Sequence, residues 1–412
     1  MGLKPFLKYA FRVLLILFST GFTSYGQTFK QFIESDDIDT KCGIAEELSL
    51  EYVVSDLDSL RMMGESLLKF SNKLQSKKGI NMSYYVIGNY LTRTAKEQEG
   101  MELLRQAKNY YLSIENYNLV TSILNEIGNA YQYLGKHEES CKWYEQSLKY
   151  GEFASDEYVM HAARINLAQA YNHLEKYEQA KEQAEQYRDW VLKLGSLKSS
   201  SNAFAVLGSI ELNQGKNKQA IYYFEQCYKF AVRAGDNSGQ GHAFTNIGIA
   251  KYLEGDMDES ERYFKEALEF RKQVRNVAMT CDAYLNYGGI LYERGKNEAA
   301  IENYETGLNL ARKHKKYTNE IEFLEALKEL YATYDPKKIE ELDHDIELAQ
   351  KLQTYFDHDQ QKIDDVLASE LRESDKIRKS GFVSESNRWP FYIGASILFV
   401  GFFFLVVRKK LN

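Results

Sequence analysis

A small residue returns every forty positions through most of this chain. The positions carry glycine or alanine and are Gly88, Gly128, Ala168, Gly208, Gly248 and Gly288. A large side chain precedes each of them, and another small residue follows twelve positions later. Because regular self-similarity of this length marks stacked units of supersecondary structure, we expect repeated neighbours, rather than a single globular core, to bury the apolar side chains.

The second half of the repeat has its own pattern. Sixteen positions beyond the small residue the side chain is large and nineteen beyond it is small, except that Ala184 and Tyr187 are exchanged. Small residues let two helices approach closely, and large residues fill the space between neighbouring helix pairs. No segment alternates with a period of two for long enough to indicate a sheet. We therefore predict an all-α fold, an α-solenoid of antiparallel helix pairs.

This pattern resembles the tetratricopeptide repeat family, in which Leu-Gly and Tyr on a first helix are followed by Ala and Phe on a second. Tyr131 and Tyr171 match the tyrosine of the family, whereas Glu211 and Lys251 depart from it. The interval of forty residues exceeds the usual length of about 34 and is similar to a long-helix variant found in bacterial regulatory proteins. The resemblance assigns six repeats to residues 81–320.

Weaker copies of the repeat are expected at both ends of the array, because a terminal repeat has one face in water. We assign them to residues 41–80 and 321–356. Beyond them, residues 357–388 are predicted to form a helical stalk or weak coiled coil that could support a homodimer. Three-four spacing carries this prediction and involves Leu342, Ile346, Ala349, Phe356, Ile363 and Leu367. The alternative is a capping helix on the last repeat; we favour capping as far as Phe356 and a stalk beyond it.

The N-terminus has the layout of a secretory signal peptide, residues 1–26. Three basic residues precede the apolar run 13–18, and the small residues Ser24 and Gly26 follow. This order predicts cleavage after Gly26. An uncleaved membrane anchor is the alternative, but the apolar run is short for a span.

Near the other end, residues 389–407 contain no charge and are long enough to cross a bilayer. Trp389 and Tyr392 lie at one border and basic residues begin the tail 408–412, which places the C-terminus in the cytoplasm. The last four residues also fit a dilysine retrieval signal of a eukaryotic cell, although a basic stop-transfer cluster explains the same lysines. We expect a single-pass protein of the cytoplasmic (inner) membrane with its repeats on the periplasmic side.

The four cysteines are not expected to form disulfides even in an exported protein. Cys42, Cys141, Cys227 and Cys281 fall in different repeats and at different positions within them. A disulfide needs Cα atoms within about 7 Å, whereas packed helix axes lie about 8 to 10 Å apart. Cys227 occupies a small-residue position and is predicted to be part of the core.

No catalytic, metal or cofactor motif is found in the sequence. Zinc-binding H-E-x-x-H, Cys-x-x-Cys, P-loop and G-x-S-x-G patterns are absent. Asp343, His344 and Asp345 could hold a metal, as could residues 357–359, but neighbours on a helix point in different directions, which favours a solvated charged face. The net charge is −7 and we see no basic stripe at the repeat period, so we expect no enzyme, no cofactor and no nucleic-acid partner.

Two functions fit these features. The first is a membrane-anchored scaffold whose elongated surface binds a protein or peptide outside the cytoplasm. The second is the sensory half of a signalling system, since the layout resembles bacterial chains in which exported repeats and a membrane helix precede a histidine kinase or a helix-turn-helix domain. Only five residues follow the predicted span, so the output domain would be on another chain. We favour the scaffold.

The resemblance also implies a binding surface. In the family the first helix of each pair lines the concave side, at positions two before and one after the small residue. Glu126 occupies one such position, side-chain amides dominate the others, and Asn125 lies beside them. The predicted binding residues are Asn89, Asn125, Asn129, Asn166, Gln169, Asn246 and Asn286. An amide can both donate to and accept from a peptide backbone. The lysines and arginines with which the family binds a C-terminal carboxylate are missing. Asparagines that merely solvate a helix face are the alternative.

Overall fold

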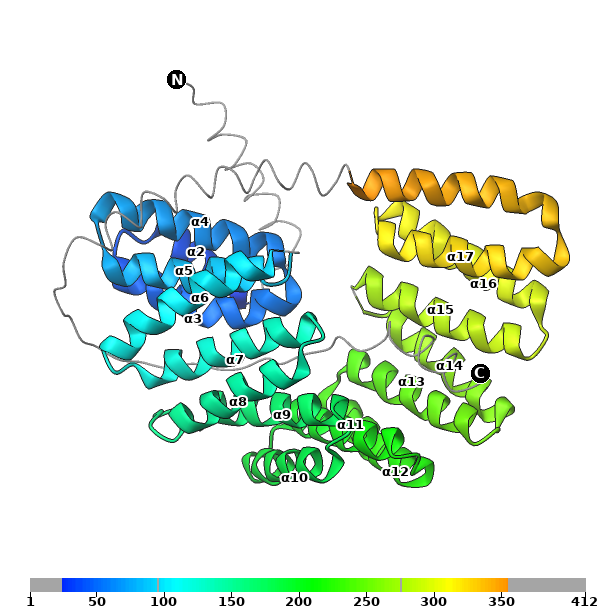
Figure 1. The fold of residues 1–412 in the computed structure, drawn as a ribbon, viewed down its shortest axis with the longest axis horizontal. Helices are drawn as coiled ribbons and strands as arrows, with labels where there is room; N and C mark the ends of the chain where they lie inside the picture. The colour runs from blue at the N-terminus through cyan, green and yellow to red at the C-terminus, as the bar shows by residue number, and fades with distance from the viewer. Residues whose placement is uncertain (1–23, 95, 275, 355–412) are drawn as a thin grey trace, which may run out of the picture. The chain divides into compact units, whose positions relative to one another are not determined.

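The computed structural model describes residues 24–94, 96–274 and 276–354, and these residues form helices and the turns between them. No strand occurs in this part of the chain, which confirms the all-α prediction (Figure 1). The chain divides into two compact units, whose described parts are residues 24–163 and 164–354. The boundary lies inside α9 (Glu157–His173).

Unit 1 contains the first helices of the array. They are α2 (Ser24–Glu34), α3 (Ile38–Ser55), α4 (Leu57–Leu74), α5 (Lys77–Leu91), α6 (Glu97–Ser113), α7 (Tyr117–Tyr133), α8 (His137–Gly151) and the beginning of α9. Each helix contacts the next one along the chain from α2 to α8, and α3 also contacts α5. Helix pairs such as α5 with α6 and α7 with α8 are the repeated element of the solenoid.

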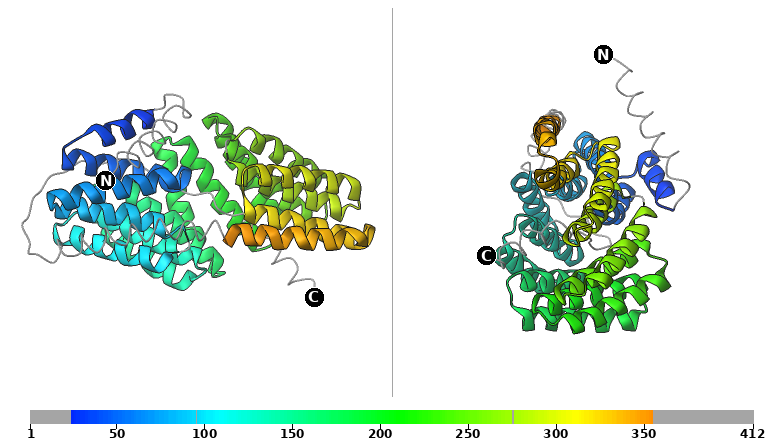
Figure 2. Two further views of the ribbon diagram at one scale, coloured as in Figure 1. Left: turned by 90° about the horizontal axis from the view of Figure 1, so that it is seen from above. Right: turned by 90° about the vertical axis from the view of Figure 1, so that its right-hand side faces the viewer.

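Unit 2 continues the same alternation. After the remainder of α9 it contains α10 (Tyr177–Leu194), α11 (Leu197–Asn213), α12 (Asn217–Ala234), α13 (Asn237–Leu253), α14 (Met257–Lys272), α15 (Val277–Glu293), α16 (Asn297–Lys313) and α17 (Tyr317–Tyr334). A short 3-10 turn (Pro336–Lys338) and a helical stretch from 339 to 354 follow. We call the odd-numbered helices from α3 to α17 first helices and their even-numbered partners second helices. Contacts of α11 with α13 and of α15 with α17 show that first helices pack on one another in a layer (Figure 2).

Local sequence explains where the first helices begin. Consecutive first helices from α7 onward start forty residues apart, and several start directly after a residue whose side chain caps the helix. Asn116 accepts a hydrogen bond from the amide of Leu119 at 3.2 Å, and Asn276 accepts one from the amide of Met279 at 3.1 Å. Such caps satisfy an amide that has no partner within the helix. The repeat therefore encodes its own helix boundaries.

The turn within each of the five helix pairs from α7 to α16 has a residue in the left-handed backbone conformation. Glycine supplies it at four repeats, with φ between +69° and +81°, and Gly215 at +74° is representative. The equivalent residue of the third repeat is Glu175, which adopts φ +58°. Because a Cβ atom disfavours this conformation, Glu175 is a strained exception to the rule.

The small residue at the centre of each first helix lies under the large residue of its second helix. A Cβ atom added to Gly208 would lie 2.5 Å from the ring of Phe224, far inside normal contact distance. The third repeat carries Ala168 at this position, and there the large residue is replaced by Ala184. Both alanines are fully buried. The apparent exchange of Ala184 and Tyr187 therefore makes room for a methyl group on the first helix.

Aromatic residues near the ends of α12 and α14 pack on a ring of the first helix of their own pair, and a neighbouring tyrosine reaches the next pair. Phe230 stacks on Phe204 with ring centroids 5.4 Å apart, and Phe270 meets Phe244 at 5.6 Å. Tyr228 of the preceding second helix stacks on Phe244 at 4.5 Å. The position recurs every forty residues as Tyr110, Tyr150, Trp190, Phe230, Phe270 and Leu310. The extended second helix thus carries an additional layer of ring contacts.

The last described helix packs on the end of unit 2. Ala349 is 1% exposed, and Leu342 and Ile346 are half buried against the core of α16 and α17. Among the described residues no helix is both long and apolar enough to span a membrane. The predicted stalk, span and tail (residues 357–412) lie outside the described part of the chain, as does most of the predicted signal peptide.

The four cysteines are buried and form no disulfide with one another. They lie on α3, α8, α12 and α15. Cys227 is 1% exposed, and burial raises the pKa of its thiol to about 11. Its predicted role as a packing residue is confirmed.

Candidate binding site

The seven predicted amide residues all lie on first helices, but they differ in how accessible they are. Unit 1 holds Asn89 on α5 and Asn125 and Asn129 on α7; unit 2 holds Asn166 and Gln169 on α9, Asn246 on α13 and Asn286 on α15. Asn89, Asn125 and Asn166 are at most 8% exposed, so they contribute little surface. The other four are half buried.

Asn129 is held by its own repeat. The hydroxyl of Tyr144 donates to Asn129 Oδ1 at 2.6 Å and also lies 3.0 Å from Gln132 Oε1. Tyr144 is the large residue that lies over Gly128, and its ring is fully buried. Its hydroxyl therefore reaches across the first helix and orients two amides on that helix. Sequence reasoning found Asn129 but not the tyrosine that positions it.

Asn246 is also engaged within its own helix. Its Nδ2 donates to the carbonyl of His242 at 2.9 Å and lies 3.1 Å from His242 Nε2. Burial, assisted by the positive charge of Arg271, lowers the pKa of His242 to about 4. The imidazole is therefore neutral at physiological pH. Of the four half-buried amides, only Gln169 and Asn286 have no hydrogen-bond partner among the described residues.

A buried ion pair accompanies the amides in unit 1. Arg93 Nη2 lies 2.6 Å from Glu126 Oε2, and the two side chains are 10% and 7% exposed. Arg93 also donates to the carbonyl oxygen of Asn89 at 3.1 Å and lies over the ring of Tyr133 at 5.5 Å. The pair links the end of α5 to α7. No motif marked Arg93 in the sequence, because its partner lies 33 residues away.

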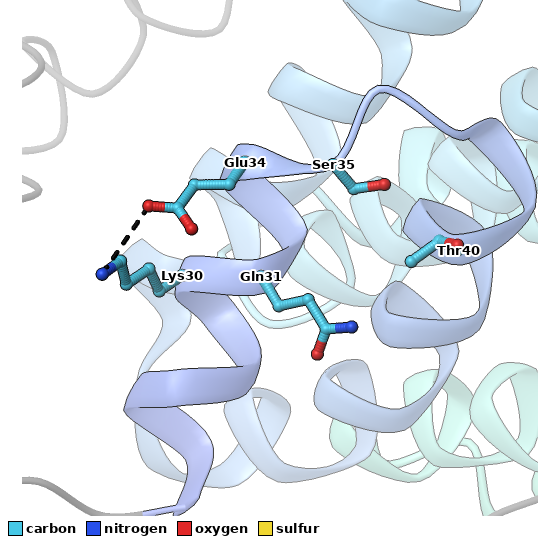
Figure 3. A pocket seen from close by; sticks show the side chains of 5 residues that line it. All are labelled: Lys30, Gln31, Glu34, Ser35 and Thr40. Atoms are coloured by element: carbon cyan, nitrogen blue, oxygen red, sulfur yellow. Dashed lines mark ion pairs between the residues drawn. The ribbon is translucent and has the colours of Figure 1, made fainter.

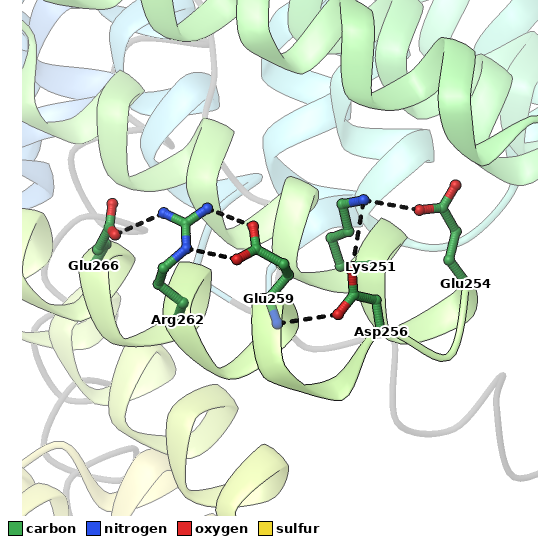
Figure 4. Close-up of polar contacts among 6 residues, drawn as sticks. All are labelled: Lys251, Glu254, Asp256, Glu259, Arg262 and Glu266. Atoms are coloured by element: carbon green, nitrogen blue, oxygen red, sulfur yellow. Dashed lines mark hydrogen bonds and ion pairs between the residues drawn. The ribbon is translucent and has the colours of Figure 1, made fainter.

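Two departures from the family tyrosine are explained by charge pairing. Glu211 is 2% exposed and accepts from Lys181 at 2.7 Å, with Lys216 at 3.7 Å. These three residues line an open depression of about 670 Å³ near the start of α12. Lys251 pairs with Glu254 at 3.0 Å (Figure 4). At both positions an ion pair replaces the aromatic side chain.

One expectation about charge is wrong. A basic position does recur at the repeat period, directly before the second helices, and comprises Lys96, Lys136, Lys176, Lys216 and Lys296. None of these lysines caps its helix with a side-chain hydrogen bond. The ammonium of Lys296 instead pairs with Glu261 at 2.7 Å and that of Lys216 with Glu211. In unit 2, carboxylates of neighbouring helices therefore compensate Lys216 and Lys296, while the ammonium of Lys176 lies over the ring of Tyr171.

The outer charges of α14 are compensated too. Arg262 lies 2.6 Å from Glu259 and 2.9 Å from Glu266, and all three side chains are more than 40% exposed (Figure 4). Exposed pairs of this kind contribute little stability. They leave no carboxylate here without a counter-ion.

Unit 2 also contains two carboxylates that converge on one amide. Asn319 Nδ2 donates to Asp282 Oδ1 at 3.2 Å and to Glu322 Oε2 at 3.1 Å. Burial, reinforced by Glu322, raises the pKa of Asp282 to about 6, and burial likewise raises the pKa of Glu322. Neither carboxylate has an ion pair within the described chain. Arg271 is nearby and 3% exposed, but it donates to Ser238 Oγ at 3.0 Å and to Met279 Sδ at 3.2 Å.

Two further candidate sites are a surface depression at α2 and the aspartates Asp343 and Asp345. A depression of about 370 Å³ at α2 is lined by Lys30, Gln31, Glu34, Ser35 and Thr40 (Figure 3). Asp343 pairs with Lys328, and Asp345 pairs with Arg312 at 2.7 Å, so these aspartates bind neighbouring side chains. Across the described ranges no three His, Cys, Asp or Glu side chains are arranged to bind a metal. The second Asp-His-Asp stretch, 357–359, lies outside those ranges.

Comparison with known proteins supports tetratricopeptide repeats in the middle of the chain. The tetratricopeptide repeat family model matches residues 119–190, 199–273 and 239–313. These ranges cover most of the first and second helices from α7 to α16. No curated protein sequence matches the chain.

Two solved structures share the fold. A Rap protein complexed with Competence and Sporulation Factor is 14% identical, with 83% of this chain and 98% of that chain covered and a TM-score of 0.53. A signal transduction ATPase with a tetratricopeptide repeat sensor, from Pyrococcus horikoshii, is 16% identical, with 91% and 56% covered and a TM-score of 0.56. Both likenesses confirm a helical repeat solenoid.

Proposed function

We propose that this protein is a tetratricopeptide repeat scaffold that binds a peptide or an extended segment of a partner protein. In this proposal the scaffold catalyses no reaction and is held on the outer side of the cytoplasmic membrane. The proposed organisation is a signal peptide 1–26, an N-terminal repeat 41–80, six repeats 81–320, a capping repeat 321–356, a stalk 357–388, a membrane helix 389–407 and a tail 408–412.

One observation carries the binding function. The half-buried amides Gln169 and Asn286 lie on first helices and have no hydrogen-bond partner among the described residues. A side-chain amide on the surface of a first helix can pair with a backbone amide whatever the sequence of the bound segment. The Rap protein of similar fold was solved in complex with Competence and Sporulation Factor. This supports a role of the fold in binding a separate molecule.

Binding can be tested with the full chain in detergent and a library of decapeptides that are acetylated and amidated at their ends. We expect a subset of peptides to bind, and the double variant Gln169→Ala with Asn286→Ala to weaken that binding roughly tenfold, as for lost hydrogen bonds. Gln179→Ala with Gln219→Ala is the matched control, because these amides are exposed on second helices. Equal loss in both double variants would exclude the first helices as the binding surface.

The membrane arrangement needs its own experiment. Protease added outside the cytoplasmic membrane should degrade the repeats, and a chain shortened to end at Ser386 should be released in soluble form. The sequence supports this arrangement because the apolar run 389–407 is followed by three basic residues. Intact repeats recovered from the cytoplasm would refute it.

A further inference from the structure

The carboxylates Asp282 and Glu322 are half buried, and unlike Glu126, Glu211 and Glu320, which also lie on first helices, they have no ion pair among the described residues. Glu126 is paired with Arg93 at 2.6 Å, Glu211 with Lys181 at 2.7 Å, and Glu320 with Arg312 at 2.8 Å. Asp282 on α15 and Glu322 on α17 have only the shared Asn319 amide as a donor among the described residues. Desolvating a carboxylate is costly unless a cation or several donors compensate it. Neither carboxylate therefore has a cation in direct contact, and the charge of Arg271 acts on Asp282 only without an ion pair.

A second side chain between the same two helices has a polar group without a hydrogen-bond partner among the described residues. Tyr304 is 5% exposed, its ring lies against Gly288 of α15, and it meets Phe323 of α17 at a centroid distance of 6.4 Å. In the equivalent position of unit 1, the hydroxyl of Tyr144 is satisfied by two amides. The corresponding positions in this repeat hold Gly289 and Tyr292, which offer no amide side chain.

The hydroxyl of Tyr304 consequently has no hydrogen bond within the described chain. Burial, together with the carboxylate of Glu329, raises the pKa of Tyr304. The phenol therefore stays protonated and can donate. Its hydrogen-bonding group is available to a molecule that approaches between α15 and α17.

The unpaired groups are spaced along one stretch of helix. Asn286 is one turn beyond Asp282 on α15, and Gly289, beside which the Tyr304 hydroxyl is expected, is seven residues beyond Asp282. At 1.5 Å per residue, seven helical residues span about 10 Å. An extended segment covers that distance with about three residues at roughly 3.3 Å each. The carboxylate of Asp282, the amide of Asn286 and the hydroxyl of Tyr304 are thus spaced to contact one short extended segment.

We propose that α15 and α17 form a subsite for an extended peptide segment that carries a lysine or arginine side chain. The cationic group binds between Asp282 and Glu322 and donates to the carboxylate oxygens. Asn286 pairs with the backbone of the segment, and the Tyr304 hydroxyl donates to a backbone carbonyl. This inference rests on the proposed binding function and adds the charge of the ligand.

Proton binding at the subsite follows from the surrounding charges. Asp282 faces Glu322 of α17 and Arg271 of α14, while Glu325 faces Glu322 on the same helix. As the pH falls through about 6, Asp282 takes up a proton and loses its negative charge. Binding of a cationic peptide should therefore weaken below pH 6, whereas binding through Asn286 and Tyr304 should persist.

The test uses the full chain in detergent with the same capped decapeptide library, randomised at one position at a time. We expect lysine and arginine to be enriched over aspartate and glutamate at one position. The double variant Asp282→Asn with Glu322→Gln should weaken binding of the cationic peptides about ten- to a hundredfold, the range for a lost charge-assisted hydrogen bond. The control, Glu254→Gln with Glu259→Gln, removes the same charge from paired residues and should preserve the enrichment.

The variant Tyr304→Phe separates the two parts of the proposal. It should weaken binding of all library peptides by about five- to tenfold and leave the preference for cations unchanged. Peptide binding without cation enrichment, or enrichment that survives the double variant, overturns the subsite while the scaffold function stands. If the folded parent chain binds no library peptide at all, both the subsite and the proposed function are wrong.

Discussion

The glycines at the centre of the first helices allow a direct test of the packing argument. Gly208 and Gly248 occupy equivalent positions in α11 and α13. An added Cβ at Gly208 would lie 2.5, 2.6 and 2.9 Å from three ring atoms of Phe224. At Gly248 the nearest ring atoms of Phe264 lie at 3.3 to 3.4 Å. The same substitution by alanine therefore meets a severe clash in one repeat and only tight contact in the next.

The expected magnitudes follow from two opposing terms. Replacing glycine by alanine inside a helix stabilises it by about 1 kcal/mol, and this gain is common to both sites. Overpacking a filled core costs about 1 to 3 kcal/mol. Phe224 is fully buried and cannot swing away, so this cost falls on Gly208→Ala. Gly248→Ala should be neutral or stabilising, and Gly208→Ala should be less stable than it by about 1 to 3 kcal/mol.

Urea unfolding and hydrogen exchange would measure this difference. Because each repeat contacts only its neighbours, faster exchange after Gly208→Ala should be confined to helices near α11. The double variant Gly208→Ala with Phe224→Ala copies the natural pair Ala168 and Ala184, and its energetic cost should be smaller than the sum of the two single costs. Equal effects of alanine at Gly208 and Gly248, or additive costs, would refute the reasoning.

Three further outcomes are expected. Glu126→Ala should destabilise unit 1 by about 3 to 5 kcal/mol because it leaves Arg93 buried without its partner, and the double variant Arg93→Ala with Glu126→Ala should cost less than the sum of the single variants in a urea cycle. Glu175→Gly should stabilise the third repeat by about 0.5 to 1 kcal/mol, since glycine relieves the positive φ, with Gln179→Ala as a neutral control in thermal unfolding. The folded-state pKa of Asp282, about 6, lies above its ordinary value of 3.8, so the native state holds the proton more tightly than the unfolded state does. The contribution of this group to the free energy of unfolding therefore falls as the pH rises from 4 to 6. Asp282→Asn should flatten that part of the curve of unfolding free energy against pH, and an unchanged curve would contradict the assignment.

The fold could be predicted from the sequence because the repeat is a local pattern. The step of forty residues from Gly88 to Gly288 predicts the small residues at the centre of the first helices from α5 to α15, but not other close contacts such as that of Gly64 with Ile87. Asparagine and aspartate before the first helices, and glycine at the turns, are signals read within a few residues of one another. Side-chain size and capping act over short distances along the chain, so the sequence predicts them well.

The binding site could be predicted only in part from the sequence. The repeat register placed Asn129, Asn246 and Asn286 on first helices, but it could not show which of them already have partners. Tyr144 holds the first and His242 the second, whereas Asn286 has no hydrogen-bond partner in the described chain. Whether an amide is free depends on side chains brought near it by packing, and the family pattern does not specify those side chains.

The charges were decided by tertiary structure alone. Arg93 and Glu126 are 33 residues apart, and Lys181 and Glu211 are 30 apart, yet each pair is in direct contact. In the sequence these residues look like the many solvated charges of a chain with 52 basic and 59 acidic residues. Only packing shows which carboxylates gain a cation and which, like Asp282, do not. The sequence by itself determined the repeat and its helices, because the size of the side chains repeats along the chain. Tertiary structure decided which charges are compensated, because desolvation and ion pairing depend on three-dimensional neighbours that differ from one repeat to the next.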